Sequence, residues 1–391
     1  MIPRQMEARL LALRDAFPVV TLEGPRQSGK TTLCKAAFPD YAYANLEMSD
    51  ARDLARSDPR GFFRQFPPPV VVDEVQRVPE LLSEIQVLAD ERGRCGQFIL
   101  TGSHQPRLRE GIAQTLAGRT ALATLLPLSL SELAAVGQSP DREECIFRGF
   151  LPSLYDRPQN PTDLHEAYYR TYVERDVRLL VNLTHQDAFE RFLRLLAGRV
   201  GREVNLEGMS GEAGVSATTL REWMGVLEAS FVIFRLQPYY RNFGKRFTKS
   251  PKVYFTDVGL AAHLLGIRTA QQVSRDPLFG GLFENLVVAE ALKAQRNRGI
   301  PPSLYYVRER SGAEIDLLVE SGRQLHLFEI KSGMTPNLDM GRHLAAFRKR
   351  VPEAVSSTVV YSGEPWPLPP DGRFVNFRDM GAEIERACAT A

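Results

Sequence analysis

A glycine-rich loop followed by lysine and threonine lies near the start of the chain. It has the pattern G-x4-G-K-[ST], formed by Gly24, Pro25, Arg26, Gln27, Ser28, Gly29, Lys30 and Thr31 and continued by Thr32. Glycines let backbone amides turn toward phosphates, the lysine brings charge to the β- and γ-phosphates, and the threonine hydroxyl suits Mg²⁺. An apolar run at 19–22 predicts a strand before the loop, and helical residues follow it. This setting favours a phosphate-binding loop over a chance glycine-rich turn.

Two acids end a second apolar run. Three valines at 70–72 predict a buried strand, and Asp73 and Glu74 follow them. An acid at the end of a strand can supply a second contact to Mg²⁺, which suits Asp73. Glu74, one position further, could orient and deprotonate an attacking water. The alternative is a helix cap, because acids also favour the first turn of a helix. The phosphate-binding loop upstream favours the catalytic interpretation.

A third apolar run, at 98–100, ends in Thr101, Gly102 and Ser103. Either hydroxyl could bond a γ-phosphate or the attacking water, and Ser103 is the candidate sensor. A serine that caps the next helix is the alternative. Further on, Arg119 precedes an apolar strand expected at 121–126.

The elements that position these residues alternate between strand and helix, which predicts an α/β domain with a parallel sheet. Their order resembles that of the AAA+ ATPases. The resemblance implies ATP and Mg²⁺ as ligands, and it places Arg119 where that superfamily has its arginine finger. Such an arginine would act on a neighbouring subunit, which implies a homo-oligomer. An ordinary surface or intramolecular salt bridge is the alternative for Arg119.

The middle of the chain is mainly helical. Helices expected at 189–197, 206–213 and 217–229, followed by strands at 231–236 and 253–255, predict a winged helix. Six basic residues and no acidic ones lie between Ala229 and Thr256. This basic stretch, Arg235 to Lys252, could neutralise DNA phosphates while its aromatic residues stack on bases. Alternatively, it meets an acidic surface of the same protein.

The last third carries acids and a lysine on elements that could converge. Glu284 lies near the start of a predicted helix, and a hairpin is expected from 314–320 and 324–331 around Gly322. That register sets Asp316 opposite Glu329, with Lys331 on the same face as Glu329. Such a set could hold Mg²⁺ and activate water against a phosphodiester, and it resembles the PD-(D/E)xK nuclease-like fold. Cross-strand ion pairs, such as Asp316 with Lys331, are the alternative.

Length, charge and cysteine content limit the classes of protein to which these sites can belong. The chain has 391 residues, enough for two or three domains, and its net charge of +2 leaves nucleic-acid affinity to a local patch. Four scattered cysteines indicate neither a disulfide framework nor a zinc site. We find no signal-peptide pattern and no apolar run near the ~18 residues that a membrane span needs. We therefore expect a soluble cytoplasmic protein that does not bind membranes.

The motifs together resemble one group of proteins. They are GPRQSGKTTL, VVVDEVQRVPELL, FILTGSHQ, LAGRTALATLLPLSLSEL, YYRNFGKRFTKSPKVYFTDVGLAAHLLG and the hairpin EIDLLVE…FEIKSG. They look like the prokaryotic AAA-type ATPases whose C-terminal half is a domain of unknown function. The resemblance implies an AAA+-like P-loop domain at 1–135, a helical linker with a winged helix at 136–270, and a nuclease-like α/β domain at 271–391.

The leading functional hypothesis is Mg-dependent ATP binding and hydrolysis. The nucleotide state would drive conformational change or assembly of the C-terminal module, with DNA as a candidate platform. An ATP-gated, metal-dependent nuclease and a non-hydrolysing ATP switch that binds a protein partner are the alternatives.

Overall fold

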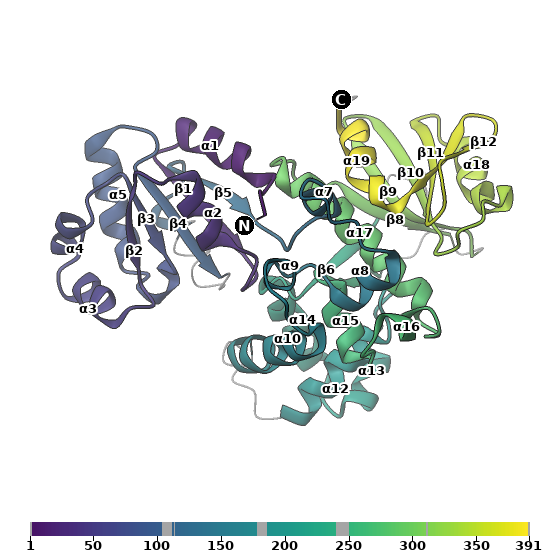
Figure 1. Cartoon of the computed structure of the whole chain (residues 1–391), viewed down its shortest axis with the longest axis horizontal. Helices are drawn as coiled ribbons and strands as arrows, with labels where there is room; N and C mark the ends of the chain where they lie inside the picture. Colours follow the sequence, from purple (N-terminus) through teal and green to yellow (C-terminus); the bar gives the residue numbers. More distant parts are fainter. Residues whose placement is uncertain are drawn as a thin grey trace. The chain divides into compact units, whose positions relative to one another are not determined.

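The computed structural model describes residues 2–103, 112, 114–177, 186–239, 250–309 and 312–389. The chain forms two compact units, shown in Figure 1. The first unit comprises Met1–Leu128 with the short segments Ala229–Phe231 and Arg296–Ile300, and the second comprises the remaining residues.

The first unit is built around a five-stranded parallel sheet with the order β2-β3-β4-β1-β5. The strands are β1 (Val19–Gly24), β2 (Ala42–Asn45), β3 (Val70–Asp73), β4 (Phe98–Ser103) and β5 (Thr120–Thr124). The helices are α1 (Met6–Ala16), α2 (Lys30–Ala37), α3 (Ser49–Ser57), α4 (Pro59–Gln65), the 3₁₀ turn η1 (Val75–Arg77) and α5 (Leu81–Arg92). The predicted α/β architecture of this unit is confirmed.

The apolar runs form central strands because both faces of the sheet are covered. Val70 and Val72 join the core that includes α5, whereas Val71 points into the core formed with α1 and α2. Alternate residues of a strand face opposite sides, so a strand covered on both sides needs apolar residues at every position. All four residues of β3 are buried, including Asp73.

The second unit combines helices with an eight-stranded mixed sheet of order β12-β13-β11-β10-β9-β8-β6-β7. Its strands are β6 (Ile233–Pro238), β7 (Lys252–Phe255), β8 (Leu304–Arg308), β9 (Glu314–Ser321), β10 (Gln324–Ile330), β11 (Ala354–Tyr361), β12 (Trp366–Leu368) and β13 (Gly372–Asn376). Its described helices and turns are α7 (Leu130–Ala134), α8 (Arg142–Arg148), α9 (Ser153–Asp156), α10 (Pro161–Tyr168), the π-helix η2 (Tyr169–Val177), α12 (Gln186–Ala197), α13 (Leu206–Ala213), α14 (Ala217–Ala229), α15 (Val258–Leu264), α16 (Ala270–Val273), α17 (Phe279–Asn297), η3 (Leu338–Gly341), α18 (Arg342–Arg348), η4 (Phe377–Asp379) and α19 (Met380–Ala389).

The hairpin of β9 and β10 has the register that the sequence predicted. Gln324 pairs with Ser321 and Phe328 with Leu317, and Gly322 takes a φ of 57° in the turn. The strands expected at 231–236 and 253–255 form as the antiparallel pair β6 and β7, while the winged helix itself stays a prediction. Because β6 runs parallel to β8, both strands belong to the same sheet as the C-terminal hairpin. This sheet therefore contains strands from both sides of residue 270, and the domain boundary that the resemblance implies there stays a prediction.

Among the described residues, no helix has the length and apolar character needed to span a membrane.

Candidate functional site

The glycine-rich loop follows β1 and leads into α2. Gly24 has a φ of 155°, and a Cβ there would lie 2.1 Å from the carbonyl oxygen of Leu125, so a side chain does not fit. Gln27 and Gly29 also have positive φ values, of 60° and 92°. The remaining predicted loop positions differ in exposure: Pro25 and Ser28 are buried, Arg26 is half-buried, and Gln27 and Thr32 are exposed. Backbone turns of this kind aim amides at an anion.

The ammonium group of Lys30 lies inside this loop. It donates hydrogen bonds to the carbonyl oxygens of Gly24 and Pro25, at 3.0 and 2.8 Å. Burial lowers the pKa of Lys30 to about 8, against the attraction of Glu74 and Asp73. Arg4 links the loop to the segment after β5. Its guanidinium donates to the carbonyl oxygens of Ser28 and Leu126 at 2.6 and 2.7 Å. A buried ammonium group inside the loop, bonded to carbonyl oxygens, is well placed to meet a phosphate.

Three hydroxyl groups converge on the buried carboxylate of Asp73. Thr31 Oγ1 and Tyr43 Oη donate to Asp73 Oδ2 at 2.8 and 2.6 Å, and Thr101 Oγ1 donates to Oδ1. The contact between Thr31 and Asp73 joins the two groups predicted to hold Mg²⁺. Both supply oxygen atoms, the ligands that Mg²⁺ prefers, so the donor set fits that ion.

Glu74 has a strained backbone. Its φ and ψ of 60° and 44° lie in the left-handed region, which is costly for a residue with a side chain. Its amide donates to Thr101 Oγ1 at 3.3 Å, and Gln76 Nε2 donates to its carboxylate. Burial raises the pKa of Glu74, and the charge of Lys30 partly offsets this. Strain of this kind, next to a phosphate loop, is typical of a functional position.

The parallel sheet explains why these groups meet. The carboxyl ends of β1, β3 and β4 lie at one edge, so the loop, Asp73 and the end of β4 come together there. Ser103 is the last residue of β4, but its side chain lies outside the described residues, and its sensor role stays a prediction. Thr101, the other hydroxyl considered, bonds Asp73 and Glu74.

Arg119 lies just before β5, at the amino ends of the strands. The glycine-rich loop lies at their carboxyl ends. Its backbone carbonyl accepts a hydrogen bond from Val19, the first residue of β1. Its guanidinium pairs with Asp90 of α5 through Nε and Nη2, at 2.5 and 2.9 Å. Since the loop lies at the other end of β1, Arg119 cannot reach a nucleotide bound by its own chain. The intramolecular salt bridge is present, and the arginine-finger role stays a prediction.

Sequence reasoning missed several residues of this site, namely Arg4, Tyr43 and Gln76. Tyr43 reaches Asp73 because β2 pairs with β3. No local sequence pattern predicts such pairing between distant segments. Gln76 lies two positions after Glu74, so proximity alone could have suggested it. Arg4 lies 24 residues before Ser28, and no local pattern connects the two.

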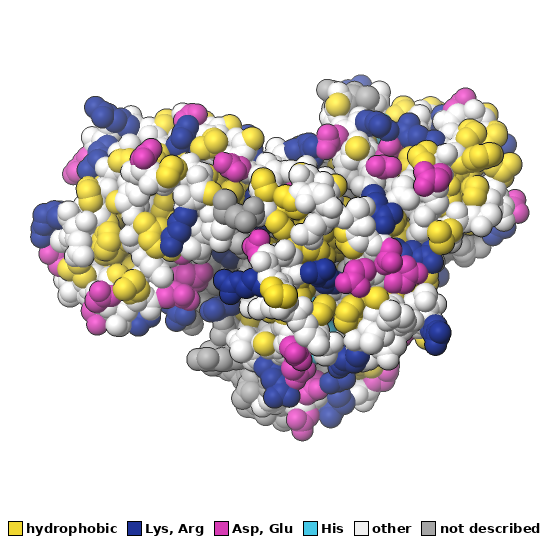
Figure 2. Space-filling view, in the orientation of Figure 1, with side chains coloured by type: hydrophobic (Ala, Val, Ile, Leu, Met, Phe, Trp, Pro, Cys, Tyr) yellow, Lys and Arg dark blue, Asp and Glu magenta, His cyan; other side chains and the backbone are white. Residues whose placement is uncertain are grey.

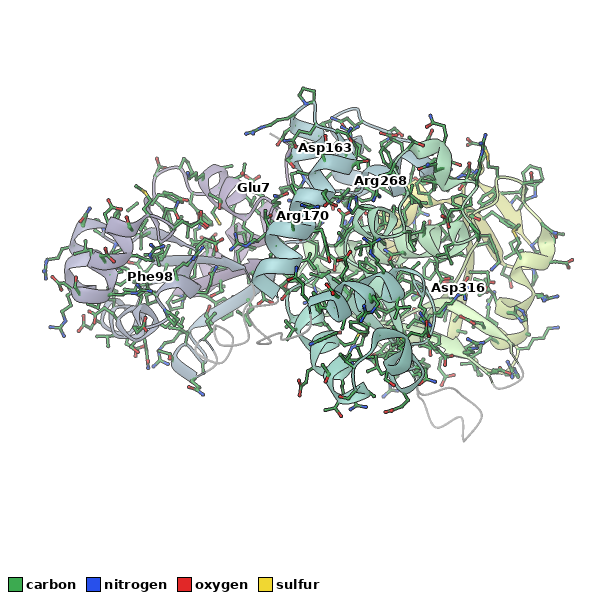
Figure 3. All side chains as sticks on the ribbon, turned by 90° about the horizontal axis from the view of Figure 1, so that it is seen from below. Glu7, Phe98, Asp163, Arg170, Arg268 and Asp316 are labelled. Atoms are coloured by element: carbon green, nitrogen blue, oxygen red, sulfur yellow. The ribbon has the colours of Figure 1, made fainter. Side chains whose placement is uncertain are left out.

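In the second unit the predicted acids Glu284, Asp316 and Glu329 form ion pairs with lysines. Lys252 Nζ donates to Glu284 Oε1 at 2.9 Å and contacts Glu314, and Tyr254 Oη donates to the same Glu284 oxygen at 2.6 Å. Lys331 Nζ lies 2.5 Å from Glu329 Oε1 and 3.6 Å from Asp316 Oδ2. Figure 3 labels Asp316, which lies on β9.

The pKa values of two of these carboxyl groups, Glu284 and Glu329, are raised. Burial raises the pKa of Glu284 to about 7, and the charge of Lys252 works in the opposite direction. Burial and the neighbouring Asp316 raise the pKa of Glu329 to about 7. In the part of the chain that the structure describes, no three His, Cys, Asp or Glu side chains are grouped so that they could hold a metal ion. As arranged, this set does not fit the metal that a nuclease-like site requires.

The basic stretch is only partly described. Arg235 pairs with Glu228 at the surface, whereas Lys252 is buried against Glu284 and Glu314 and is therefore not available to a DNA phosphate. The other four basic residues, Arg241, Lys245, Arg246 and Lys249, lie outside the described residues. For Lys252 the structure supports the alternative, an acidic surface of the same protein. On the face shown in Figure 2, basic and acidic side chains are interspersed over both units.

The fold and the loop geometry define the first unit as a P-loop ATPase domain of the AAA type. Residues 16–134 match the family described as AAA domain. Residues 139–271 and 279–369 match two domains of unknown function, DUF8612 and DUF4143.

Most of the chain matches curated relatives. It is 31% identical over 366 residues to the uncharacterized protein Rv2008c of Mycobacterium tuberculosis, covering 92% of this chain and 80% of the relative. The uncharacterized protein Mb2031c of Mycobacterium bovis matches equally well. The chain therefore belongs to the same family as these two proteins.

Two solved structures also resemble it. The Walker-type ATPase paby2304 of Pyrococcus abyssi matches with a TM-score of 0.46 and 15% identity, covering 68% of this chain and 96% of that one. AMPPCP-bound DnaA from Aquifex aeolicus matches with a TM-score of 0.29 and 14% identity, covering 57% of this chain and 85% of that one.

Proposed function

We propose that this protein binds and hydrolyses Mg-ATP at the edge of the first sheet, and that its nucleotide state changes the conformation of the second unit. The observation that carries the proposal is the direct contact between Thr31 and Asp73, at 2.8 Å, beside the strained and buried Glu74. A phosphate loop, a magnesium pair and a positioned base are the parts that phosphoryl transfer to water needs.

Binding replaces contacts that the loop now makes with itself. The ammonium of Lys30 would exchange the carbonyl oxygens of Gly24 and Pro25 for phosphate oxygens, which carry a full charge. The amides of the loop and of the first turn of α2 would donate to the same phosphates. Thr31 and Asp73 would hold Mg²⁺, which neutralises negative charge on the phosphates.

Glu74 is the general base in this proposal. Water attacks the γ-phosphorus, its proton passes to the Glu74 carboxylate, and the bond from phosphorus to the bridging oxygen breaks. ADP leaves with the electron pair of that bond. A carboxyl group whose pKa is raised by burial takes up a proton more readily, which suits this step. Gln76 holds the carboxylate in place by donating to it.

The deciding experiment compares Glu74→Gln with the wild-type protein. We expect Mg²⁺-dependent phosphate release by the wild type, a loss of at least a hundredfold in the variant, and retained ATP binding by calorimetry. Lys30→Ala is the control that should lose binding itself. Equal turnover in Glu74→Gln would remove Glu74 from its role. Tight binding without turnover by the wild type would instead favour an ATP switch that acts on a protein partner.

The arginine finger and the homo-oligomer that it requires belong to the same proposal. Arg119 and Asp90 form one ion pair, so Arg119→Ala and Asp90→Ala remove the same intramolecular contact. Only Arg119→Ala should lower turnover, by ~10³-fold or more if the guanidinium contacts a neighbour's γ-phosphate. Wild-type activity per chain should also rise with protein concentration. Equal activity of both variants would leave the salt bridge as the role of Arg119.

We do not extend the proposal to DNA cleavage. The acids of the second unit are engaged by lysines, and their arrangement does not fit a metal ion.

A further inference from the structure

A cavity of about 340 Å³ in the second unit is lined by the end of α18, the first half of β11 and the turn that joins β12 to β13 (Figure 1). All of its lining residues fall within 341–372, so the cavity belongs to one unit. Its volume lies at the lower end of the ~300–1,000 Å³ typical of small-molecule sites. The size therefore suits a small ligand.

Part of the lining is apolar. Leu368 is buried and packs against two glycines: a Cβ on Gly341 would lie 2.8 Å from both of its methyl carbons, and a Cβ on Gly372 would lie 2.9 Å from one of them. These short distances leave no room for a side chain at either glycine, so Leu368 packs directly against the backbone. The remaining apolar residues of the lining are Ala345, Pro352, Ala354, Pro369 and Pro370. This surface suits an apolar ligand body.

Two cations at the end of α18 give the cavity a positive side. Arg348 is half-buried, and its Nε donates to the carbonyl oxygen of Ala354 at 3.2 Å, which holds the guanidinium beside the cavity. Lys349 is exposed and lines the same side. In the part of the chain that the structure describes, neither pairs with an acid, whereas the neighbouring Arg350 pairs with Glu309. Cations are common in the last turn of a helix, so they do not by themselves indicate a ligand.

A buried hydroxyl group is a second, independent sign of a ligand. Ser357 lines the cavity and is 5% exposed, and its Oγ has no hydrogen-bond partner among the described residues. It lies on the face of β11 that also carries Val359 and Tyr361, which pack in one core with α18. Buried polar groups without a partner are rare, because losing water without gaining a hydrogen bond is costly. The hydroxyl therefore marks a position where a ligand acceptor is missing.

We propose that this cavity binds a small organic monoanion with one carboxylate, an acceptor oxygen and an apolar body. The carboxylate pairs with the Arg348 guanidinium, which can donate two parallel hydrogen bonds to it, and Lys349 adds charge. The Ser357 hydroxyl donates to the acceptor oxygen, and the apolar body lies against Leu368. Asp371 is the only acid among the described lining residues, so two cations and one acid leave one positive charge, which one carboxylate neutralises. This inference concerns the second unit alone and does not rest on ATP hydrolysis.

Saturation-transfer NMR titrations on the full chain, with 3-benzoylpropionate as the probe, test the inference. This compound has a carboxylate, a ketone oxygen and a phenyl ring. We expect the wild type to bind it, and its Kd to rise at least about tenfold in Arg348→Gln, because charge-assisted hydrogen bonds are lost. Arg350→Gln removes a neighbouring cation outside the lining and should bind the probe as the wild type does. The neutral amide of the probe should bind the wild type at least about tenfold more weakly.

Ser357→Ala separates a ligand contact from a structural role. We expect the Kd of the probe to rise about threefold, because one neutral hydrogen bond is lost. The free energy of unfolding in urea should not fall, because the hydroxyl has no partner in the described part of the folded protein. A loss of stability together with an unchanged Kd would assign the hydroxyl to packing and overturn its place in the ligand site.

Three results would overturn the inference as a whole: no saturation transfer from the wild type to the probe, an equal Kd in Arg348→Gln, or equally tight binding of the neutral amide. Binding that Lys30→Ala abolishes and Arg348→Gln keeps would assign the anion to the phosphate loop instead. If Arg348→Gln does not fold, as judged by circular dichroism, Arg348→Lys takes its place. That variant keeps the charge but loses the paired donors, so the Kd should still rise, and an unchanged Kd counts against the inference in the same way.

Discussion

At the scale of single residues, the chemistry of the first unit depends on how Asp73 is held. Its three hydroxyl donors come from three elements: Thr31 from α2, Tyr43 from β2 and Thr101 from β4. Hydrogen bonds to an ionised acceptor are about twice as strong as neutral ones, so this arrangement fixes the carboxylate before any ligand arrives. Thr31 and Thr101 belong to sequence motifs. Tyr43 does not, and it reaches Asp73 because β2 pairs with β3.

Tyr43→Phe removes one of these donors and keeps the ring. A hydrogen bond to a charged group contributes roughly 1.5 kcal/mol or more, so we expect kcat/KM for Mg-ATP to fall about tenfold as the carboxylate loses its orientation. ATP binding in the presence of EDTA should not change. Tyr41→Phe is the matched control, since its hydroxyl donates to the carbonyl of Gly96 and does not contact Asp73. Unchanged kcat/KM in Tyr43→Phe would mean that Thr31 and Thr101 alone orient the Asp73 carboxylate.

At the scale of elements, the P-loop depends on close contact between two backbones. The absence of a side chain at Gly24 lets β1 approach Leu125, the residue that follows β5 by one position. Gly24→Ala forces these backbones apart and should destabilise the first unit by roughly 3 kcal/mol while abolishing ATP binding. Gly93→Ala also introduces a side chain at positive φ, 57°, but with open space around it. It should cost about 1 kcal/mol and leave binding intact.

Urea unfolding monitored by circular dichroism, together with calorimetric titration of ATP, measures both glycine variants. Equal losses of stability, or full ATP binding by Gly24→Ala, would contradict the role of this backbone contact.

The sequence predicted the positions of helices and strands better than it predicted which strands pair with each other. Local signals placed β4 at residues 98–103, α13 at 206–213 and the register of β9 against β10, because periodicity and turn chemistry act over a few residues. No local signal placed β4 between β1 and β3, or joined β6 to β8. Those pairings bring together residues far apart in the chain. For the same reason Lys252 was interpreted as part of a DNA-binding stretch, although it is buried against acids.

Two helices of the second unit are joined by a contact that depends on pH. His263 of α15 lies 3.0 Å from Glu166 of α10, and His165 of α10 lies nearby, with 6.2 Å between ring centroids. Burial lowers the pKa of His263, and its interaction with Glu166 works in the opposite direction, while Arg268 and His165 lower it further. The neutral form of His263 is therefore the one that the folded protein favours.

The sign of the pH effect follows from that pKa. As pH falls below about 6.5, the unfolded chain protonates this histidine before the folded protein does, so the unfolded state binds more protons. Stability should therefore decline on acidification until the lower pKa of the folded state is reached. We expect wild type to lose more unfolding free energy between pH 7.5 and 5 than His263→Gln, in urea titrations at each pH. Parallel curves would contradict this contribution.

At the scale of the whole molecule, the two units are not joined by a single linker. The chain passes between them at residue 128 and at both ends of the segments Ala229–Phe231 and Arg296–Ile300, which belong to the first unit. Within the first unit, Asn297 Nδ2 donates to Gln5 Oε1 at 3.3 Å. The chain therefore crosses between the two units at several points.

Hydrogen exchange measured by mass spectrometry separates ATP binding from its effect on the second unit. The Glu74→Gln protein with saturating Mg-ATP should exchange more slowly in the peptides of β1, the P-loop and β3. Stabilisation by a ligand at a hundred times its Kd is ~2.7 kcal/mol, which slows exchange through global opening about a hundredfold. If the nucleotide state changes the second unit, the peptides of β9 and β10 should also change their exchange. Lys30→Ala with Mg-ATP should show neither effect. Protection confined to the first unit would uphold ATP binding and refute the coupling, because both units are observed in the same molecule and under the same conditions.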